Sequence, residues 1–243
     1  MNTFQKLVLY CKKSIRLLQR YPRWSSFAAI VRYGPAWFTY TRPGINSISA
    51  QLPWITFPAI HAIKKILRPE MRLFEYGSGG STLFWASRVK QVVSVEHDKT
   101  WYEKMATEMD GRPIKNVDYF LIEATADDQF ARKKPGIPTD YISADEQYAG
   151  KNFERYVKKI DEYPDAHFDI VMVDGRARPA CILHALKKIK KGGYLIVDNT
   201  ERAYYLQPFQ WETEGWQQHD YPGFGTFDYN FSQTTLFKKN NPR

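Results

Sequence analysis

Four acidic residues stand at the ends of apolar runs, and these ends are where chemistry is expected. Glu75 and Glu96 each close a short apolar run, and Asp174 and Asp198 directly follow two more. Apolar runs of this length between turn residues predict buried strands. The carboxyl ends of parallel strands meet at one edge of a sheet, where ligands bind. Because unpaired buried carboxylates are costly, four at one edge favour a binding site over four separate structural roles.

A glycine-rich turn follows the first of these acids. The run Gly77-Ser-Gly-Gly80 leaves bare backbone at a strand end, which lets a ligand approach closely. Ser81 and Thr82 suit the start of the amphipathic helix that follows, and a helix N-terminus offers N–H groups to a negative group. Glu96 ends the next predicted strand, where a carboxylate can accept hydrogen bonds from both hydroxyls of a ribose. The stretch therefore predicts a nucleoside-binding βαβ unit.

Two details separate this stretch from a dinucleotide site. The third glycine of GxGxxG is missing, and Glu75 would repel a diphosphate but not a cationic aminoacyl group. The run Glu75–Ser81 resembles motif I of the class I S-adenosylmethionine (SAM) methyltransferases, and Glu96 resembles their ribose-binding acid. The likeness extends over residues 55 to 238. It implies SAM as the cofactor, bound by Glu75, Tyr76, Gly77, Ser78, Gly79, Ser81, Thr82, Glu96, His97, Asp127 and Asp174.

A metal site is a further expectation. Asp174, Asp198 and Asn199 fall at adjacent predicted strand ends, and three hard oxygen ligands suit Mg²⁺ or a similar divalent cation. The trio resembles the metal ligands of catechol- and caffeoyl-type O-methyltransferases, where the metal would lower the pKa of a substrate hydroxyl. The departure is Arg176 and Arg178, two cations beside the expected metal. Either they bind an anionic substrate, or they pair with Asp174 and no metal binds.

The catalytic residues expected are Asp174 and Arg176. Methyl transfer requires alignment of the acceptor and removal of its proton, because the sulfonium is already electrophilic. Asp174 is predicted to act as the base or to orient the acceptor, and Arg176 to hold a carboxylate or phosphate. Because the end of the Asp174 strand also resembles that of sugar O-methyltransferases, the predicted reaction is SAM-dependent O-methylation of a small-molecule or glycan-like anionic acceptor. An RNA-directed methyltransferase and a non-catalytic adaptor at a membrane surface are the alternatives.

The net charge of +9 is concentrated at the N-terminal end. The first 69 residues contain 11 of the 35 Lys and Arg residues and no Asp or Glu. Residues 3 to 20 carry apolar side chains at three- and four-residue spacing, which predicts an amphipathic helix. This helix either lies on an anionic membrane surface or caps the main domain with its basic face in solvent. Nucleic acid is the less favoured anionic partner, because no RNA-recognition motif is present.

The order of the predicted elements gives the fold class. Alternating strands and helices predict an α/β protein with a doubly wound, mainly parallel seven-stranded sheet, helices on both faces and an N-terminal helical extension. Residues 1–53 are predicted to form the basic helix and a Pro- and aromatic-rich linker or lid that no long helix can cross, and residues 54–243 the catalytic domain. Residues 234–237 are predicted to form an antiparallel edge strand, and Gly192 and Gly193 to cap a helix.

The compartment follows from the cysteines and the hydropathy. The two cysteines, Cys11 and Cys181, indicate no disulfide framework, and no run of 18 apolar residues is present to span a bilayer. A cytoplasmic location is therefore expected, with peripheral contact at the inner membrane face as an option.

Overall fold

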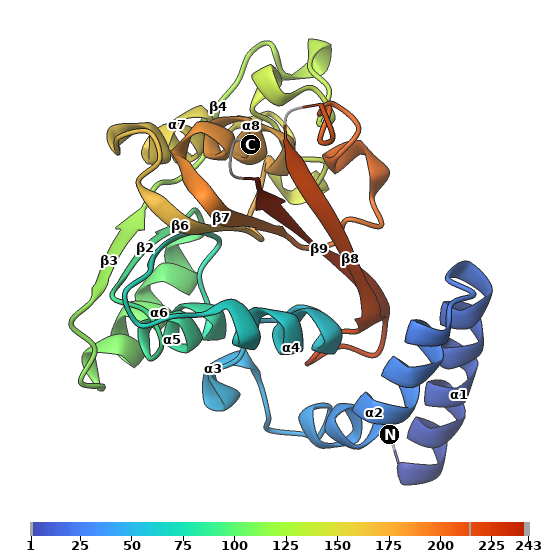
Figure 1. Cartoon of the computed structure of the whole chain (residues 1–243). Helices are drawn as coiled ribbons and strands as arrows, with labels where there is room; N and C mark the ends of the chain where they lie inside the picture. The colour runs from blue at the N-terminus through green and yellow to red at the C-terminus, as the bar shows by residue number, and fades with distance from the viewer. Residues whose placement is uncertain (1, 214, 241–243) are drawn as a thin grey trace.

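The central element is one seven-stranded sheet, seen in a computed structural model that describes residues 2–213 and 215–240 (Figure 1). Its strands are β1 Arg72–Tyr76, β2 Gln91–Glu96, β3 Val117–Leu121, β6 Phe168–Val173, β7 Ile189–Val197, β8 Trp216–Phe224 and β9 Phe231–Lys239. Their order in the sheet is β3-β2-β1-β6-β7-β9-β8. The first five are parallel, and β9 is antiparallel to both its neighbours. The predicted doubly wound, mainly parallel sheet is confirmed.

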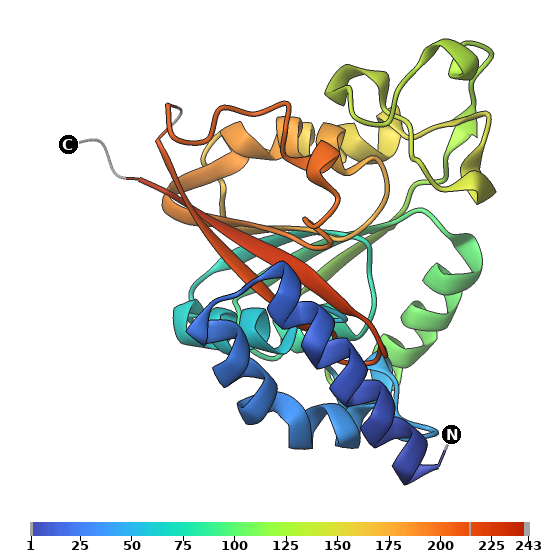
Figure 2. The same cartoon turned by 90° about the vertical axis from the view of Figure 1, so that its right-hand side faces the viewer.

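Helices cover both faces of the sheet (Figures 1 and 2). One face carries α4 Phe57–Ile66, α5 Gly80–Ala86 and α6 Lys99–Asp110, and the other carries α7 Glu154–Lys158 and α8 Arg178–Lys188. Alternate strand residues enter two separate cores: Phe74 packs on the α7 and α8 side, and Leu73 on the α4 and α5 side. Strands that are buried on both faces have continuous apolar sequences, which is why β1, β2, β6 and β7 are visible in the sequence.

Two details at the antiparallel end of the sheet differ from expectation. The antiparallel strand predicted at residues 234–237 is present within β9, but its predicted place at the edge is wrong. β9 lies between β7 and the unpredicted strand β8, which forms the edge. β8 has mostly polar residues and contains Pro222, which an edge strand tolerates because one of its sides has no ladder partner. The predicted glycine cap is also wrong: α8 ends at Lys188, and Gly192 and Gly193 lie within β7.

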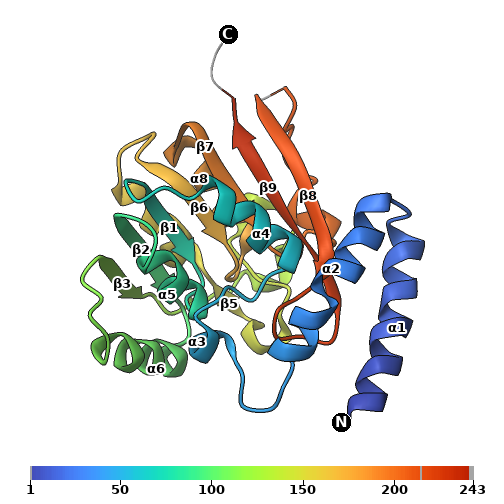
Figure 3. The ribbon, with the colours of Figure 1, turned by 60° about the horizontal axis from the view of Figure 1, so that its bottom comes forward.

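The N-terminal part forms a helical hairpin, α1 Thr3–Arg20 and α2 Trp24–Tyr40, followed by the short α3 Ser47–Ala50 (Figure 3). α1 has the predicted bounds, but the prediction that residues 21–53 contain no long helix is wrong. α2 includes Pro35, and its buried Trp37 packs 5.7 Å from Phe224 between ring centroids. Tertiary packing of this kind outweighs the local helix propensity. The boundary at residue 53 between two domains stays a prediction.

The orientation of α1 also differs from the simplest expectation. The helix turns a mixed stripe toward the body of the protein, where Tyr10 stacks on Phe224 and Lys6 donates to the carbonyl of Thr41 at 2.7 Å. The apolar stripe that predicted the helix is exposed instead. The face of α1 that meets solvent is therefore apolar as well as basic. The exposed apolar residues of α1 are Phe4, Leu7, Val8 and Ile15.

A long connection between β3 and α7 lies beyond the carboxyl ends of the parallel strands (Figure 1). It is tied at its base by the antiparallel pair β4 Thr125–Ala126 and β5 Lys151–Asn152. Between them lie three 3-10 helices, η1 Phe130–Arg132, η2 Pro138–Asp140 and η3 Glu146–Tyr148. Within the described residues, no helix has the length and apolar character needed to cross a membrane.

Candidate functional site

Two cavities open at the carboxyl ends of the parallel strands, and they share Gly175 and Arg176. The glycine-loop cavity has a volume of about 620 Å³ and is lined by Ser47, Trp54, Gly77–Ser81, Glu96–Asp98, Thr100, Trp101, Lys104, Gln147, Tyr148 and Asp174–Arg176. The arginine cavity has a volume of about 600 Å³ and is lined by Pro135, Ile142–Glu146, Gly175–Pro179, Arg202, Tyr204 and Tyr205.

The glycine turn is held tightly from two sides. Gly77 has a φ of +90°, and a Cβ there would lie 2.9 Å from the backbone of Gly175 at the end of β6. A Cβ on Gly80 would lie 1.9 Å from the carbonyl oxygen of Ser47 in α3. Contacts this short exclude any side chain at either position. The close backbone approach predicted for the turn is therefore required by the protein's own packing.

Glu96 lies at the floor of the glycine-loop cavity, where the sequence predicted it. One carboxylate oxygen accepts from the N–H groups of His97 and Asp98 at 2.7 and 2.9 Å. The other accepts from the N–H and the hydroxyl of Ser78 at 3.0 and 2.9 Å. Burial acts to raise the pKa of Glu96, but hydrogen bonds and the charge of His97 outweigh it, so the pKa lies below its usual value. Glu96 is thus an ionised carboxylate pointing at the turn.

The start of α6 completes this wall of the cavity. Asp98 is the N-cap of α6, since its side chain accepts from the N–H of Trp101 at 2.8 Å. The indole N–H of Trp101 donates to the carbonyl of Ser78 at 2.9 Å. The hydroxyl of Ser78 also lies 2.6 Å from that of Tyr119 on β3. These bonds fix the turn relative to β2, β3 and α6.

Glu75 is placed differently from the expectation of a ligand contact. Its side chain is fully buried and does not line the cavity. The carboxylate accepts from the hydroxyls of Thr82 and Ser94 at 2.6 and 2.7 Å and from the indole of Trp85 at 2.9 Å. Burial raises the pKa of Glu75 to about 7 against the effect of these bonds. Glu75 therefore joins β1 to α5 and β2.

Tyr76 and Asp127 are also absent from the lining of the glycine-loop cavity. The ring of Tyr76 is buried under α7, and its hydroxyl donates to the carbonyl of Val157 at 2.6 Å. Asp127 accepts from Lys133 at 2.7 Å and from Asn152 at 3.0 Å and so closes the β4–β5 connection. The structure therefore brings together Gly77, Ser78, Gly79, Ser81, Glu96, His97 and Asp174 of the expected cofactor residues, and leaves Glu75, Tyr76, Thr82 and Asp127 outside.

The expected metal ligands surround an arginine. Arg178 pairs with the carboxylate of Asp174 at 2.9 Å and donates to the backbone carbonyls of Gly175 and Asp198. Asp198 itself accepts from Thr234 at 2.5 Å, and it lines a separate small cavity with Asn199. A guanidinium beside these carboxylates repels a divalent cation, so the residues do not fit a metal. No cluster of three or more His, Cys, Asp or Glu side chains suited to a metal occurs elsewhere in the described residues.

The two aspartates differ in their access to ligands. Asp174 faces the glycine-loop cavity, whereas the side chain of Asp198 is buried. Burial raises the pKa of Asp174 although Arg178 and Arg176 oppose it, and burial together with the nearby Asp174 raises the pKa of Asp198. Of the two, Asp174 lines the glycine-loop cavity and Asp198 does not, so Asp174 is the one placed to exchange a proton with a ligand there.

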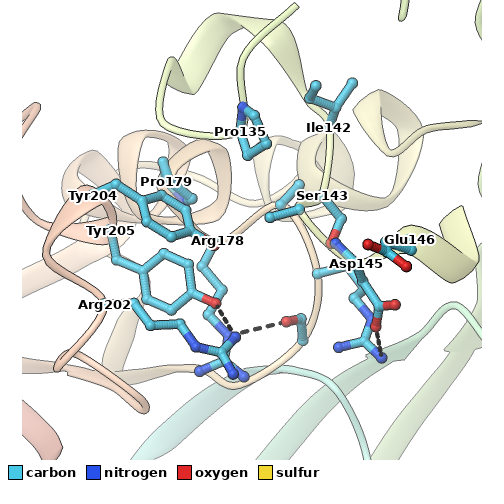
Figure 4. Close-up of a pocket in the computed structure, with 14 residues that line it drawn as sticks. Pro135, Ile142, Ser143, Asp145, Glu146, Arg178, Pro179, Arg202, Tyr204 and Tyr205 are labelled. Atoms are coloured by element: carbon cyan, nitrogen blue, oxygen red, sulfur yellow. Dashed lines mark hydrogen bonds and ion pairs between the residues drawn. The ribbon is translucent and has the colours of Figure 1, made fainter. Parts of the chain in front are cut away.

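The arginine cavity has a basic and aromatic wall and an acidic one (Figure 4). Arg202 donates to the hydroxyl of Tyr205 at 3.0 Å, and Tyr204 lies beside them. Across the cavity, Asp145 pairs with Arg176 at 2.9 Å. The side chain of Arg176 is 32% exposed. Gly175 and Arg176 line both cavities, and because glycine has no side chain beyond hydrogen, the shared side chain among the described residues is that of Arg176.

Comparisons with known proteins identify the fold. No family model and no curated protein matches the sequence. Among solved structures, an rRNA methylase from Streptococcus thermophilus matches with a TM-score of 0.52 and 13% identity over 78% of this chain and 100% of its own. An O-methyltransferase from Bacillus cereus in complex with SAH matches with a TM-score of 0.51 and 12% identity over 94% of this chain and 91% of its own. The chain has a methyltransferase fold.

Several lining residues of the glycine-loop cavity were not found in the sequence. Ser47 comes from the stretch interpreted as a linker or lid, and Trp54 lies directly after it, at the start of the predicted catalytic domain. That interpretation was the only signal for Ser47, and Trp54 had none. Asp98 precedes a helical pattern and is recognisable as an N-cap. Trp101, Lys104 and Tyr148 carry no local signal, because their place depends on how α6 and the β3–α7 connection pack.

Proposed function

We propose that this protein is a SAM-dependent methyltransferase that methylates oxygen on a small anionic acceptor. The observation that carries this proposal is the position of Glu96 and Ser78 at the ends of β2 and β1, facing one cavity beside the glycine turn. A volume of about 620 Å³ lies in the range of cavities that bind cofactors. The methyltransferase fold supports the same conclusion.

Glu96 can bind a ribose only by exchanging one of its present partners. A carboxylate has about four acceptor positions, and in this structure three backbone N–H groups and the hydroxyl of Ser78 donate to Glu96. The Nδ1 atom of His97 also lies 2.8 Å from the oxygen that accepts from His97 and Asp98. The backbone donors are fixed, whereas the Ser78 hydroxyl can rotate and keep its bond to Tyr119. A ribose hydroxyl therefore takes the place of the Ser78 hydroxyl at Glu96.

The acceptor is assigned to the arginine cavity. It adjoins the glycine-loop cavity at Gly175 and Arg176, so ligands in the two cavities meet there. Arg202 has no carboxylate partner among the described residues and is available to an anion, while Arg176 can turn from Asp145 to a ligand. Guanidinium groups bind carboxylate and phosphate through paired hydrogen bonds. The two tyrosine rings suit a flat or sugar-like body attached to that anion.

SAM, when bound, supplies an electrophilic methyl group. The protein must then align the acceptor oxygen and take its proton. Asp174 borders the glycine-loop cavity next to the shared wall, and Arg178 holds its carboxylate through one oxygen, at 2.9 Å. The other oxygen has no described partner and is free to accept the proton. A raised pKa makes this carboxylate a stronger base than an exposed aspartate.

A second candidate is methylation of RNA, and the basic first 69 residues are the observation in its favour. The rRNA methylase among the similar structures belongs to this class. A transcribed ribosomal RNA fragment tested beside small acidic acceptors separates the two candidates.

Titration of the purified protein with SAM and, in parallel, with NAD tests the proposal. Saturable heat with SAM and none with NAD is expected. Labelled SAM with pools of acidic sugars and phenolic acids then tests transfer, and loss of binding to SAM in the first step would end the proposal.

A further inference from the structure

The α1–α2 hairpin exposes apolar side chains on both of its helices. Phe4 and Ile15 on α1 are 73% and 57% exposed, and Trp24 and Val31 on α2 are 80% and 64% exposed. With Leu7 and the exposed Cys11 on α1, and Phe27 on α2, these residues recur at three- and four-residue steps and so form one stripe on each helix. The stripes are distinct from the surfaces by which the helices contact the rest of the protein. Scattered exposed apolar residues are ordinary, but a continuous stripe on each of two neighbouring helices indicates an interaction surface.

The charge around these stripes has one sign. The first 69 residues carry 11 basic residues and no acidic ones. Lys12, Arg16 and Arg20 follow one another at four-residue steps on α1, and none of them forms an ion pair within the described part of the chain. Two copies of this surface would bring like charges together, which disfavours self-association. A partner with an anionic surface and an apolar interior matches both the basic charge and the exposed apolar stripes.

A groove beside α2 extends the surface. It has a volume of about 580 Å³ and lies between α2, α4 and strands β8 and β9. Arg32, His61, Lys65 and Lys238 line it, and no carboxylate does. Burial lowers the pKa of His61, and the neighbouring Arg32, Lys65 and Lys64 lower it further, as expected for an uncompensated positive field. The groove therefore attracts a phosphate-sized anion attached to an apolar body.

We propose that the α1–α2 hairpin docks on an anionic bilayer and that the groove binds the phosphate of a phospholipid. On α2, the lining residues Ala28 and Arg32 directly follow the exposed Phe27 and Val31, so the groove and the apolar stripe are on adjoining faces. An amphipathic helix with basic neighbours lies in the headgroup region with its apolar side chains in the acyl boundary. Trp24 at the hairpin turn suits that interface.

Sedimentation of the full-length protein with vesicles tests this proposal. Vesicles of phosphatidylglycerol and phosphatidylcholine, mixed at about one to two, are compared with vesicles of pure phosphatidylcholine. The protein is expected to pellet with the anionic vesicles only, and less so as the salt concentration rises. Absence of binding to the anionic vesicles at low salt would overturn the proposal.

Two pairs of substitutions test the two parts of the surface. Ile15→Ser with Trp24→Ser removes apolar contact, and Arg32→Gln with Lys65→Gln removes two charges from the groove. Each pair is expected to lower vesicle affinity by about tenfold or more. The matched controls are Ile137→Ser and Lys90→Gln, exposed residues of the same types elsewhere on the protein, which should bind as the wild type does.

The outcomes separate the other occupants of this surface. Circular dichroism and thermal unfolding first establish that the variants are folded. Wild-type vesicle binding by both folded pairs would overturn the proposal. A second result would also overturn it: light scattering shows a dimer for the wild type and a monomer for Ile15→Ser with Trp24→Ser, and neither protein binds vesicles. The stripes would then be a self-association surface.

Discussion

Replacement of Glu96 by glutamine tests the cofactor site most directly. The change keeps the size of the side chain but puts an NH₂ group against donors whichever way the amide is turned. In one orientation it faces the N–H groups of His97 and Asp98, and in the other the N–H of Ser78. A buried donor left without an acceptor costs about 1–3 kcal/mol. The free energy of unfolding should therefore fall by about that amount.

Binding of SAM should weaken for a related reason. A ribose hydroxyl that donates to a carboxylate makes a charge-assisted bond, worth about 1.5–3 kcal/mol. Loss of that bond weakens affinity by at least about tenfold, since 1.4 kcal/mol corresponds to a factor of 10. Calorimetric titration of folded Glu96→Gln measures this directly, with Glu103→Gln on the exposed side of α6 as the matched control. A folded Glu96→Gln with wild-type affinity for SAM would refute the assignment of Glu96 to the ribose.

Three further predictions concern Glu75, Arg176 and the absence of a metal requirement. The pKa of Glu75 is raised from 4.5 to about 7 in the folded protein, so the folded state keeps a proton that the unfolded state loses. Stability should then fall by up to about 3 kcal/mol as the pH rises from 4.5 to 7, and Glu75→Gln should flatten this part of the pH profile; an unchanged profile contradicts the argument. Arg176→Gln should raise KM for an anionic acceptor by about tenfold, a larger change than in its affinity for SAM. As the control, the variant and the wild type should have the same KM for a neutral analogue of the acceptor. Dialysis against a chelator should leave turnover unchanged, because Arg178 lies where the cation was expected; activity restored only by Mg²⁺ would contradict that.

The parts of the fold visible in the sequence are those in which local pattern and burial agree. The strands that end in Glu75–Tyr76 and Glu96 are apolar on both faces because helices cover both sides of the sheet. The glycine run that follows the first strand marks the end of that strand. α2 was hidden because Pro35 contradicts the helix locally, while the packing of Trp37 that stabilises it comes from β8 and α1. The edge strand β8 was hidden because its outward residues are polar.

The site shows the same division. Glu96 and the glycine turn could be identified from the sequence because each follows from the end of one of two neighbouring strands, which brings them together. The sequence offered two roles for Arg178, and only the three-dimensional arrangement decides for the pair with Asp174. Glu75 was misplaced because a carboxylate at a strand end can face either the ligand edge or the neighbouring helix. The hydroxyls of Thr82 and Ser94 and the indole of Trp85 turn it to the helix.

The shared wall at Gly175 and Arg176 has a thermodynamic consequence. A ligand in the arginine cavity that draws Arg176 away from Asp145 also changes the charge facing the glycine-loop cavity. The two binding equilibria are then coupled through one side chain, and the coupling free energy must be the same whichever ligand binds first. An acceptor that tightens SAM binding is itself bound more tightly by the SAM-loaded protein, so the affinities measured for either ligand alone understate those of the complete complex.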